Sequence, residues 1–279
     1  ASNINVTGGT LEIRPTAGTV LADAGYYNIN TSASLFDLLI DRASSTSVVQ
    51  LNNSPLVLLN DLILTSGDFS ANNLNVTIGG DFSIAGGTSF TTGTNTTTFN
   101  GTEDQSFTVN LAAPLLLNKL TIDKPAGIAL NFAGTQSTIN VADNFRLVKG
   151  TLNDNGNTIN LANGVYNSGL HTGTGKIVLN GTVLQAIDGG GIFNNLELVN
   201  TNAAAAPVSL SANTTINGAL TLSNNKIFII GTYNLLLNAS ASIINGSALR
   251  YIQTSGNSGD GGITKVYSPS SPSFVFPIG

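Results

Sequence analysis

The sequence predicts an all-β protein folded as a right-handed parallel β-helix, and three observations support this prediction. Charged residues make up only 9% of the 279 residues, well below the roughly 25% typical of soluble domains. Asn, Thr, Ser and Gly supply the polarity; Asn, Thr, Ser and Gly disfavour helix interiors, whereas Val, Ile and Thr suit strands. Short segments of alternating apolar residues, separated by Asn-Gly and Gly-Gly turns, recur in long repeats. A repeat array favours a solenoid, because each unit can bury its apolar face only against the next one.

The clearest repeat is Asn-Gly-Thr-x-x-Gln, which occupies residues 100–105 and returns at residues 180–185, an offset of 180 − 100 = 80 residues. The flanking segments return in the same order. We therefore predict three degenerate repeats of roughly 75–80 residues, at about residues 34–110, 115–191 and 192–247. The third unit departs from the pattern at its end.

Each unit is expected to contain the same strands in the same order, marked by apolar residues at period two. The opening strand is marked by Leu35, Leu38 and Ile40, by Leu117, Leu120 and Ile122, and by Phe193, Leu196 and Leu198. The short second strand spans residues 48–51, 128–130 and 208–210. The strand before a turn carries Leu62 and Leu64, Phe145 and Leu147, and Leu220 and Leu222. Beyond the turn the pattern resumes at Phe69, Leu152 and Ile227, then at residues 74–78, 159–161 and 235–237.

The repeat is too long to be a single coil. If each coil uses ~20–25 residues, the chain makes about a dozen coils in a rod ~50–60 Å long, and one repeat spans three or four coils. Apolar side chains would then stack inside. Asn side chains at turns can bond along the axis like the backbone, and Asn100 and Asn180 are candidates for such ladders.

Three regions follow from this pattern. Residues 1–33 are N-terminal coils or a lead-in, residues 34–267 form the β-helix repeat region, and residues 268–279 are an extended segment that leaves the solenoid. Three of the eight prolines crowd into that last segment, and proline removes a ladder donor. We expect the native chain to continue beyond it.

Composition narrows the function. The net charge is −5 and no basic patch is visible, so nucleic acid is an unexpected partner. Zero cysteines exclude disulfides and thiolate metal sites. No apolar run approaches the 18 or so residues of a transmembrane helix, so no membrane insertion by this segment is expected.

Two sets of residues are candidates for catalysis. Glu103 and Asp104 are the only adjacent acids, and a carboxylate pair on a β-helix suggests glycan cleavage. Their counterparts are Val183 and Leu184, so a solvated turn is the preferred interpretation. His171, the sole histidine, lies in a Gly/Thr-rich segment with no nucleophile pattern nearby. We interpret it as a surface-turn histidine.

Three segments resemble known binding motifs. Residues 153–157 and 255–262 look like calcium loops but lack the EF-hand spacing or a repeated nonapeptide, so both are predicted turns. Residues 96–98, three threonines, could begin an ice- or glycan-binding face, although threonines do not recur in every coil. Sequons such as residues 100–102 are expected by chance. The sequence therefore predicts no catalytic, cofactor-binding or metal-binding residues, and no cofactor.

The repeats have a family resemblance. The pattern apolar-Asn-Gly-Thr-x-x-Gln, the segment 193–198 and the closing runs 250–252, 261–265 and 274–279 resemble repeats of very large Bacteroidetes surface proteins and the segment that follows them. The resemblance implies parallel β-helix repeats, export by the type IX secretion system and a place at the cell surface. Some such proteins are adhesins, including gliding adhesins. The family supplies no catalytic residues to transfer.

Three functions remain open at this point. The leading hypothesis is a non-enzymatic, structural and adhesive segment of a large secreted cell-surface protein, a stiff stalk or binding wall. Its partners would be surface glycans or other extracellular surfaces, adjoining repeats or neighbouring copies, and the export machinery. The alternatives are a polysaccharide lyase or glycoside hydrolase on the same scaffold, and a self-assembling extracellular fibre subunit.

Overall fold

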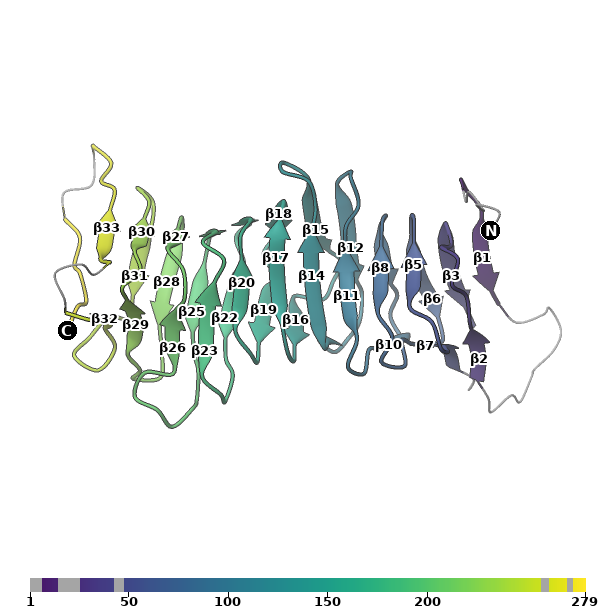
Figure 1. The fold of residues 1–279 in the computed structure, drawn as a ribbon, viewed down its shortest axis with the longest axis horizontal. Coiled ribbons are helices and arrows are strands. Elements are labelled where there is room, and N and C mark those ends of the chain that lie inside the picture. The colour runs from purple at the N-terminus through teal and green to yellow at the C-terminus, as the bar shows by residue number, and fades with distance from the viewer. Residues whose placement is uncertain (1–6, 15–25, 43–47, 257–260, 270–272) are drawn as a thin grey trace.

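From the third strand onward, every third strand returns to the same face of the molecule, so the chain winds as a three-sided coil (Figure 1). The computed structural model describes residues 7–14, 26–42, 48–256, 261–269 and 273–279. These residues form parallel sheets and include no helix, and hence none long and apolar enough to cross a membrane. The solenoid rises through about 10 turns, slightly fewer than the dozen expected. The predicted all-β parallel solenoid is confirmed.

Four sheets form the three faces. Sheet A contains β1 (Thr10–Ile13), β3 (Asp37–Asp41), β6 (Leu62–Ser66), β9 (Phe82–Ile84), β12 (Gln105–Val109), β15 (Ala129–Ala133), β18 (Thr151–Asn153), β21 (Leu170–Thr172), β24 (Ile192–Phe193), β27 (Thr214–Ile216), β30 (Leu235–Leu237) and β33 (Ile263–Lys265). Sheet C contains β5 (Leu56–Leu58), β8 (Val76–Ile78), β11 (Thr96–Phe99), β14 (Lys119–Asp123), β17 (Phe145–Lys149), β20 (Val165–Asn167), β23 (Gln185–Asp188), β26 (Val208–Leu210), β29 (Phe228–Gly231) and β32 (Ile252–Thr254).

The third face is divided between two sheets. Sheet B contains β2 (Tyr26–Ile29), β4 (Val48–Leu51), β7 (Asp68–Ser70) and β10 (Ser89–Thr91). Sheet D contains β13 (Leu115–Leu117), β16 (Thr138–Val141), β19 (Thr158–Leu161), β22 (Lys176–Leu179), β25 (Leu196–Leu198), β28 (Ala219–Leu222) and β31 (Ser242–Ile244). This face is therefore interrupted between β10 and β13.

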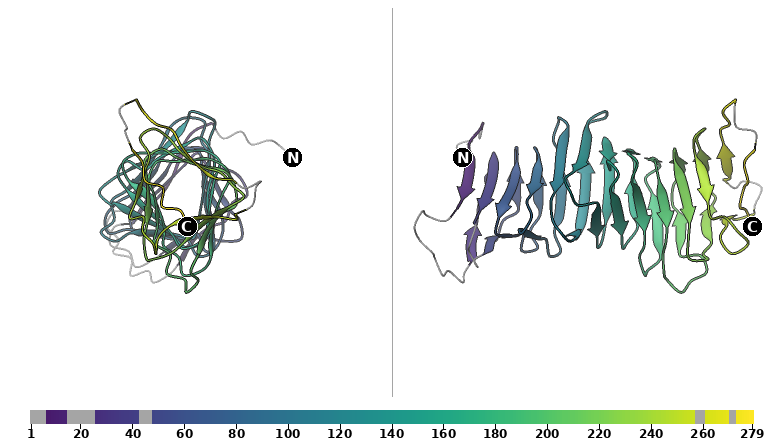
Figure 2. Two further views of the ribbon diagram at one scale, coloured as in Figure 1. Left: turned by 90° about the vertical axis from the view of Figure 1, so that its left-hand side faces the viewer. Right: turned by 180° about the vertical axis from the view of Figure 1, so that it is seen from behind.

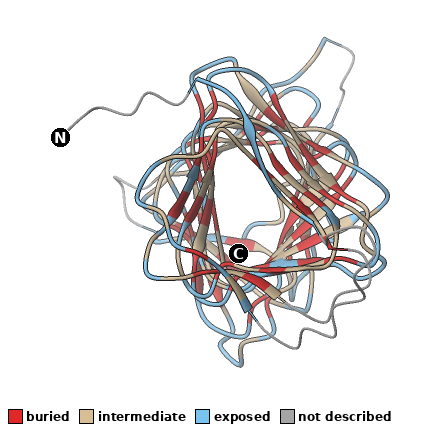
Figure 3. Ribbon diagram, turned by 90° about the vertical axis from the view of Figure 1, so that its right-hand side faces the viewer, coloured by how far each residue is buried: buried red, intermediate tan, exposed pale blue. Residues whose placement is uncertain are grey.

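The core is one apolar column along the axis. Figure 3 shows buried residues along the strands of all three faces, and Figure 2 shows how the coils stack along the rod. Phe82, Phe107 and Phe132 stack on successive strands of sheet A, with ring centroids 5.1 and 5.0 Å apart. Each buried side chain of this kind contributes about 1.5–3 kcal/mol, which lets the fold stand with few charges.

The sequence repeat does not coincide with whole turns. The opening strands of the three units are β3, β14 and β25, so one repeat covers 14 − 3 = 25 − 14 = 11 strands. Because three strands make a turn, a repeat spans three and two-thirds turns. Successive repeats are thus rotated by one third of a turn, and the opening strand lies in sheet A, then C, then D. Each repeated feature is therefore displayed on a different face.

Two local predictions are wrong. Asn100 and Asn180 follow β11 in sheet C and β22 in sheet D, so they cannot stack, and both are exposed. Amide ladders form elsewhere: Asn160 Nδ2 donates to Asn140 Oδ1 at 3.0 Å, one coil apart. Ile227 was expected to resume the apolar pattern, but it precedes β29, whose inward residues are Phe228 and Ile230.

The ends of the described chain belong to the same stack. β1 pairs with β3 and β2 with β4, both in parallel. At the other end Ile278 pairs in parallel with Ile252 of β32, and Ile252 N donates to Pro277 O at 2.8 Å. The last residues of the segment 268–279 therefore lie against the final coil, so the prediction that this segment leaves the solenoid does not hold for them.

Candidate functional site

The repeated Asn-Gly-Thr-x-x-Gln segment builds a buried polar corner. Gln105 lies at the start of β12, where its Oε1 accepts from Gly101 N at 3.1 Å. Its Nε2 donates to Ile78 O at 3.1 Å and to Gly80 O, both in the preceding coil. The amide therefore replaces water for a turn and for the coil below it, because buried backbone groups need partners.

The second copy of the segment repeats this geometry on another face. Gln185, in β23 of sheet C, accepts from Gly181 N at 3.0 Å. Its Nε2 donates to Leu161 O at 2.8 Å and Asn163 O at 2.6 Å. The motif is thus a structural glutamine, and the repeat preserves it because each donor and acceptor of the amide is used.

A side chain from the next coil completes each glutamine corner. Lys124 Nζ donates to Gln105 Oε1 at 2.6 Å and to Gly101 O at 3.0 Å. Asn200 Nδ2 donates to Gln185 Oε1 at 2.6 Å and to Val183 O at 2.7 Å. Lys124 and Asn200 are both 1% exposed and follow equivalent strands, β14 and β25. One corner is closed by a cation and the other by a neutral amide.

The electrostatics of the first corner explain its acidic turn. Burial lowers the pKa of Lys124 to about 8, and the carboxylates of Asp104, Asp81 and Glu103 counteract that effect. Glu103 and Asp104 are exposed, and Asp104 Oδ1 accepts from Ala129 N at 2.7 Å. These acids therefore lie in a turn at the surface, near a buried cation.

A second acidic group lies along the same edge. Asp61 Oδ1 accepts from Asp81 N at 2.7 Å. Burial raises the pKa of the Asp61 carboxyl, the neighbouring carboxylates of Asp81 and Asp37 raise it further, and the bond from Asp81 N opposes them. The Asp61 carboxylate thus accepts a hydrogen bond from the backbone of the next coil, which is a structural role.

His171 is not a surface residue, contrary to the prediction. It points inward from β21 and is fully buried with Asp154. Its Nε2 contacts Asp154 Oδ2 at 2.8 Å, and its Nδ1 accepts from Asn194 N at 3.3 Å. Nε2 therefore carries the proton. With both ring nitrogens engaged and no exposure, this pair holds coils together and cannot reach a substrate.

A signal for this burial was present in the repeat. His171 is the central residue of β21, and β10, eleven strands earlier, has Phe90 at its centre. The position is therefore a core position, and only the chemistry of the side chain changes. The histidine was misassigned because its partner Asp154 lies 17 residues away in sequence.

The other predicted motifs have structural places. Asp154 Oδ1 accepts from Gly156 N at 2.9 Å and Gly175 N at 2.8 Å, so residues 153–157 form a turn, as predicted. Residues 257–260 of the second glycine-rich segment lie outside the described residues. Among residues 96–98, Thr97 points inward.

Of the two outward threonines of that strand, Thr96 pairs with Lys119, and Thr98 belongs to a short column only. Thr98 pairs with Thr77 on one side and Thr121 on the other. The column continues as Val57 and Arg146. It is therefore three coils long, which is too short for a repetitive flat threonine face.

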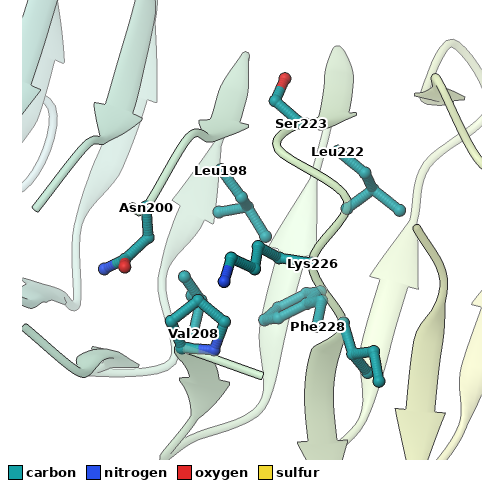
Figure 4. A pocket seen from close by; sticks show the side chains of 9 residues that line it. Leu198, Asn200, Val208, Leu222, Ser223, Lys226 and Phe228 are labelled. Atoms are coloured by element: carbon teal, nitrogen blue, oxygen red, sulfur yellow. The ribbon is translucent and has the colours of Figure 1, made fainter. Parts of the chain in front are cut away.

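Figure 4 shows a small cavity at the corner between sheets D and C, beside Asn200. Lys226 reaches across it and donates from Nζ to Asn202 O at 2.7 Å and Ala204 O at 2.8 Å. The cavity measures about 10 Å³, room for about one water molecule. Lys226 thus ties the loop that contains Asn202 and Ala204 to the stack. The cavity is too small for a larger ligand.

A larger opening lies where the third face is interrupted. This lateral groove has a volume of about 360 Å³, within the range of about 300–1,000 Å³ of small-molecule sites. Its lining includes Phe90, Thr92, Gly93, Leu116, Asn118 and Ala142. It is the candidate functional site of the described chain.

Pro114 lies directly before β13, at the interruption. Its register equivalents in later coils, Thr158 and Lys176, donate to the preceding coil, to Ser137 O at 2.8 Å and Asn157 O at 3.1 Å. Proline has no N–H, so β13 cannot make the corresponding bond toward β10. The loss of this bond does not by itself end a sheet, because Thr138 N, the equivalent in the next coil, donates to Gln136 Oε1 and β16 still pairs with β13.

Buried polar side-chain atoms without hydrogen-bond partners among the described residues occur in the two coils beside the groove. They are Asn95, whose Nδ2 and Oδ1 are both unpaired, Thr97 at Oγ1 and Asn118 at Oδ1. Asn95 is 0% exposed, and Lys119 N donates to Asn95 O at 3.2 Å. Asn95 and Asn118 thus occupy matching positions of neighbouring coils, and Asn118 itself lines the groove.

Sequence reasoning missed this site. Its residues come from three coils, and no motif links them; the one signal was a proline directly before a strand of a repeat. No protein-family model, curated protein or solved structure matches the chain.

Proposed function

We propose that this chain is a non-enzymatic, structural and adhesive segment of a large secreted cell-surface protein. It acts as a stiff stalk whose wall attaches to surface glycans or other extracellular surfaces, with gliding adhesion as one setting. Adjoining repeats or neighbouring copies and the export machinery are the other proposed partners. The family resemblance of the repeats supports the extracellular, Bacteroidetes-type setting.

One observation carries the proposal: a continuous stack of parallel strands from β1 to β33 with an uninterrupted apolar column inside. Bending such a rod would separate backbone bonds and core contacts in every coil, so it is stiff. Its outer wall carries amides and hydroxyls. Few backbone segments are free to enter a protease active site, which favours resistance to proteases.

The buried polar groups support a scaffold role as well. Gln105, Gln185 and the His171–Asp154 pair use their polar atoms to join coils. A catalytic group must touch its substrate, and these groups are buried.

The test is attachment and rigidity measured on the same protein. The 279-residue chain is immobilised on beads and compared with Phe107→Asp, which places a charge in the column, and with Thr108→Asp, which places it on the outer wall of the same strand. We expect the parent and Thr108→Asp to attach to glycan-coated surfaces and resist protease, and Phe107→Asp to lose both. Absence of attachment by the folded parent chain would refute the adhesive role.

A further inference from the structure

We propose that Asn245 is a site of spontaneous deamidation, and that the glutamines of the repeated motif block the same reaction at Asn100 and Asn180. A comparison of backbone N–H groups carries this inference. Wherever Gly follows Asn elsewhere in the chain, the glycine N–H is held in a hydrogen bond, and at Gly246 it is not. The modification is independent of the proposed adhesive role.

The chemistry needs only the two residues and water. The glycine nitrogen attacks Cγ of the preceding asparagine: an N–Cγ bond forms, the Cγ–Nδ2 bond breaks, and Nδ2 leaves as ammonia with the proton of the former N–H. Water then opens the succinimide, giving aspartate when it adds at Cγ and isoaspartate when it adds at the backbone carbonyl. Glycine favours the attack because it has no Cβ to hinder the approach. A glycine nitrogen that is free to move and to lose its proton is therefore the deciding feature.

The chain has six Asn-Gly pairs, which begin at residues 100, 155, 163, 180, 217 and 245. In five of them the glycine nitrogen donates a hydrogen bond: Gly101 N to Gln105 Oε1 at 3.1 Å, Gly156 N to Asp154 Oδ1 at 2.9 Å, Gly164 N to Asn163 Oδ1 at 2.8 Å, Gly181 N to Gln185 Oε1 at 3.0 Å, and Gly218 N to Asn194 O at 2.9 Å. Each nitrogen must give up that bond before it can attack, which lowers the reactive population.

The pair at Asn163 is held although its acceptor is the asparagine itself. Asn163 Nδ2 also donates to Asp143 Oδ1 at 3.1 Å, so both ends of the side-chain amide are fixed. A hydrogen bond to a carbonyl oxygen lies near the plane of the carbonyl, whereas attack on its carbon comes from above that plane. The contact with Gly164 N therefore holds the nitrogen in an unreactive position.

The sixth pair belongs to a third, altered copy of the repeated motif. Residues 245–250 read Asn-Gly-Ser-Ala-Leu-Arg, against Asn-Gly-Thr-Val-Leu-Gln at residues 180–185. Both segments lead from a strand of sheet D to a strand of sheet C, from β31 to β32 and from β22 to β23 (Figure 1). Arg250 thus occupies the glutamine position. A guanidinium has only donors, so it cannot accept a bond from Gly246 N.

The local structure leaves this pair open to reaction. Asn245 and Gly246 are both exposed, so water reaches them. Gly246 N donates no hydrogen bond to any residue that the structure describes. Ser247 and Arg250 bond to each other instead, from Ser247 N to Arg250 O at 2.8 Å and from Arg250 N to Ser247 O at 3.0 Å. The altered copy therefore keeps both reacting groups and lacks the acceptor.

The two intact copies show what the glutamine adds. Asn100 and Asn180 are exposed, so water reaches their side chains as well. Gly101 and Gly181 are buried, and each donates to the glutamine of its own motif. The glutamine thus keeps the Asn-Gly turns of the inner coils chemically intact, in addition to joining the coils.

The experiment incubates the 279-residue chain in a mildly alkaline buffer, which favours loss of the N–H proton. Peptide mapping by mass spectrometry follows the conversion of amide to carboxylate, and labelling by protein isoaspartyl methyltransferase identifies isoaspartate. We expect Asn245 to react at least about fivefold faster than Asn100 or Asn180, because a hydrogen bond must break at the latter two. Asn245→Ser should remove the label from this peptide.

The urea-unfolded chain is the control for intrinsic reactivity. Every pair there has a free glycine nitrogen, so the rates at Asn245, Asn100 and Asn180 should become similar. Equal rates in the folded chain overturn the inference. An unfolded chain in which Asn245 keeps its full lead overturns it too, since the order would then come from the local sequence.

A pair of variants tests the role of the glutamine. Gln185→Leu frees Gly181 N and should speed deamidation of Asn180 at least about fivefold. Asn200→Leu is the matched control, because it removes another partner of Gln185 and leaves the bond from Gly181 N to Gln185 Oε1 in place. Asn180 should stay slow in that variant. Equal rates at Asn180 in the two folded variants would show that the glutamine does not block the reaction.

Discussion

The two glutamine corners have one backbone and one motif but different electrostatics. Gln105 is closed by the buried ammonium of Lys124, and the turn beside it carries Glu103 and Asp104. Gln185 is closed by the amide of Asn200. The equivalent turn carries Val183 and Leu184, 48% and 66% exposed.

The difference indicates that Glu103 and Asp104 are present because Lys124 is buried beside them. A buried cation needs negative charge nearby, so carboxylates are useful beside Lys124 and useless beside Asn200. The comparison of repeats favours a solvated turn over a catalytic role for Glu103 and Asp104. It could not show why they are present, because Lys124 lies a coil away in space and some 20 residues away in sequence.

The largest expected effect comes from removing the glutamines. Gln185→Leu should lower the free energy of unfolding by about 3 kcal/mol, because it leaves Gly181 N and Asn163 O without the amide and Leu161 O with only its bond from Asn180 N. Gln105→Leu should cost about 1–2 kcal/mol more, since it also removes a ligand of a buried cation. Urea denaturation measures both. An equal or larger loss for Gln185→Leu would contradict the comparison.

The next effect is the pH dependence of stability. The pKa of Lys124 is about 8 in the folded state and 10.5 when unperturbed, so the unfolded chain binds more protons between these values. The cost of burying the charge is fully present below pH 8 and is relieved as the pH rises. The free energy of unfolding should therefore increase by about 3 kcal/mol between pH 8 and pH 10.5.

Two variants isolate that pH dependence. Lys124→Met should abolish the increase, while Lys149→Met, at an exposed lysine of the neighbouring strand, should keep it. A parent protein whose stability falls steadily over this range, in the same way as Lys124→Met, would show that the buried lysine is not responsible.

A smaller effect separates the residues that close the corners. At pH 7 Lys124→Met should change stability by about 0 to +2 kcal/mol, because replacing a buried charge with an apolar chain of similar size is often neutral or stabilising. Asn200→Leu should instead destabilise by about 1–2 kcal/mol, because Val183 O and Gln185 Oε1 each lose a neutral donor. Thermal melts at pH 7 would settle the signs; a marked loss for Lys124→Met would go against this view.

The smallest effect tests the acidic turn. Asp104→Asn keeps an acceptor for Ala129 N and removes only the charge. It should destabilise the parent by about 0.5 kcal/mol and leave Lys124→Met unchanged. A double-mutant cycle reports this coupling, and an identical effect in both backgrounds would show that Asp104 and Lys124 do not interact.

The sequence by itself determined the architecture. The period-two apolar pattern, the shortage of charges and the repeat at 80 residues predicted a parallel solenoid with repeats longer than a coil. These signals are local or additive: alternation places side chains inside or outside, and repetition forces stacking. The repeated glutamine was also visible, although its task was not, because its partners Ile78 and Gly80 belong to the previous coil.

The tertiary structure alone decided what meets across coils. The rotation of the repeat by a third of a turn depends on the number of strands per turn, and it puts Asn100 and Asn180, two candidates for amide ladders, on different faces. The burial of His171 depends on Asp154 and Asn194, which lie one coil below and above it. The lateral groove lies where strand pairing on the third face stops between β10 and β13. In a solenoid the neighbours of a residue are about one coil away along the chain, at a spacing that varies with every loop, and only the wound chain fixes it.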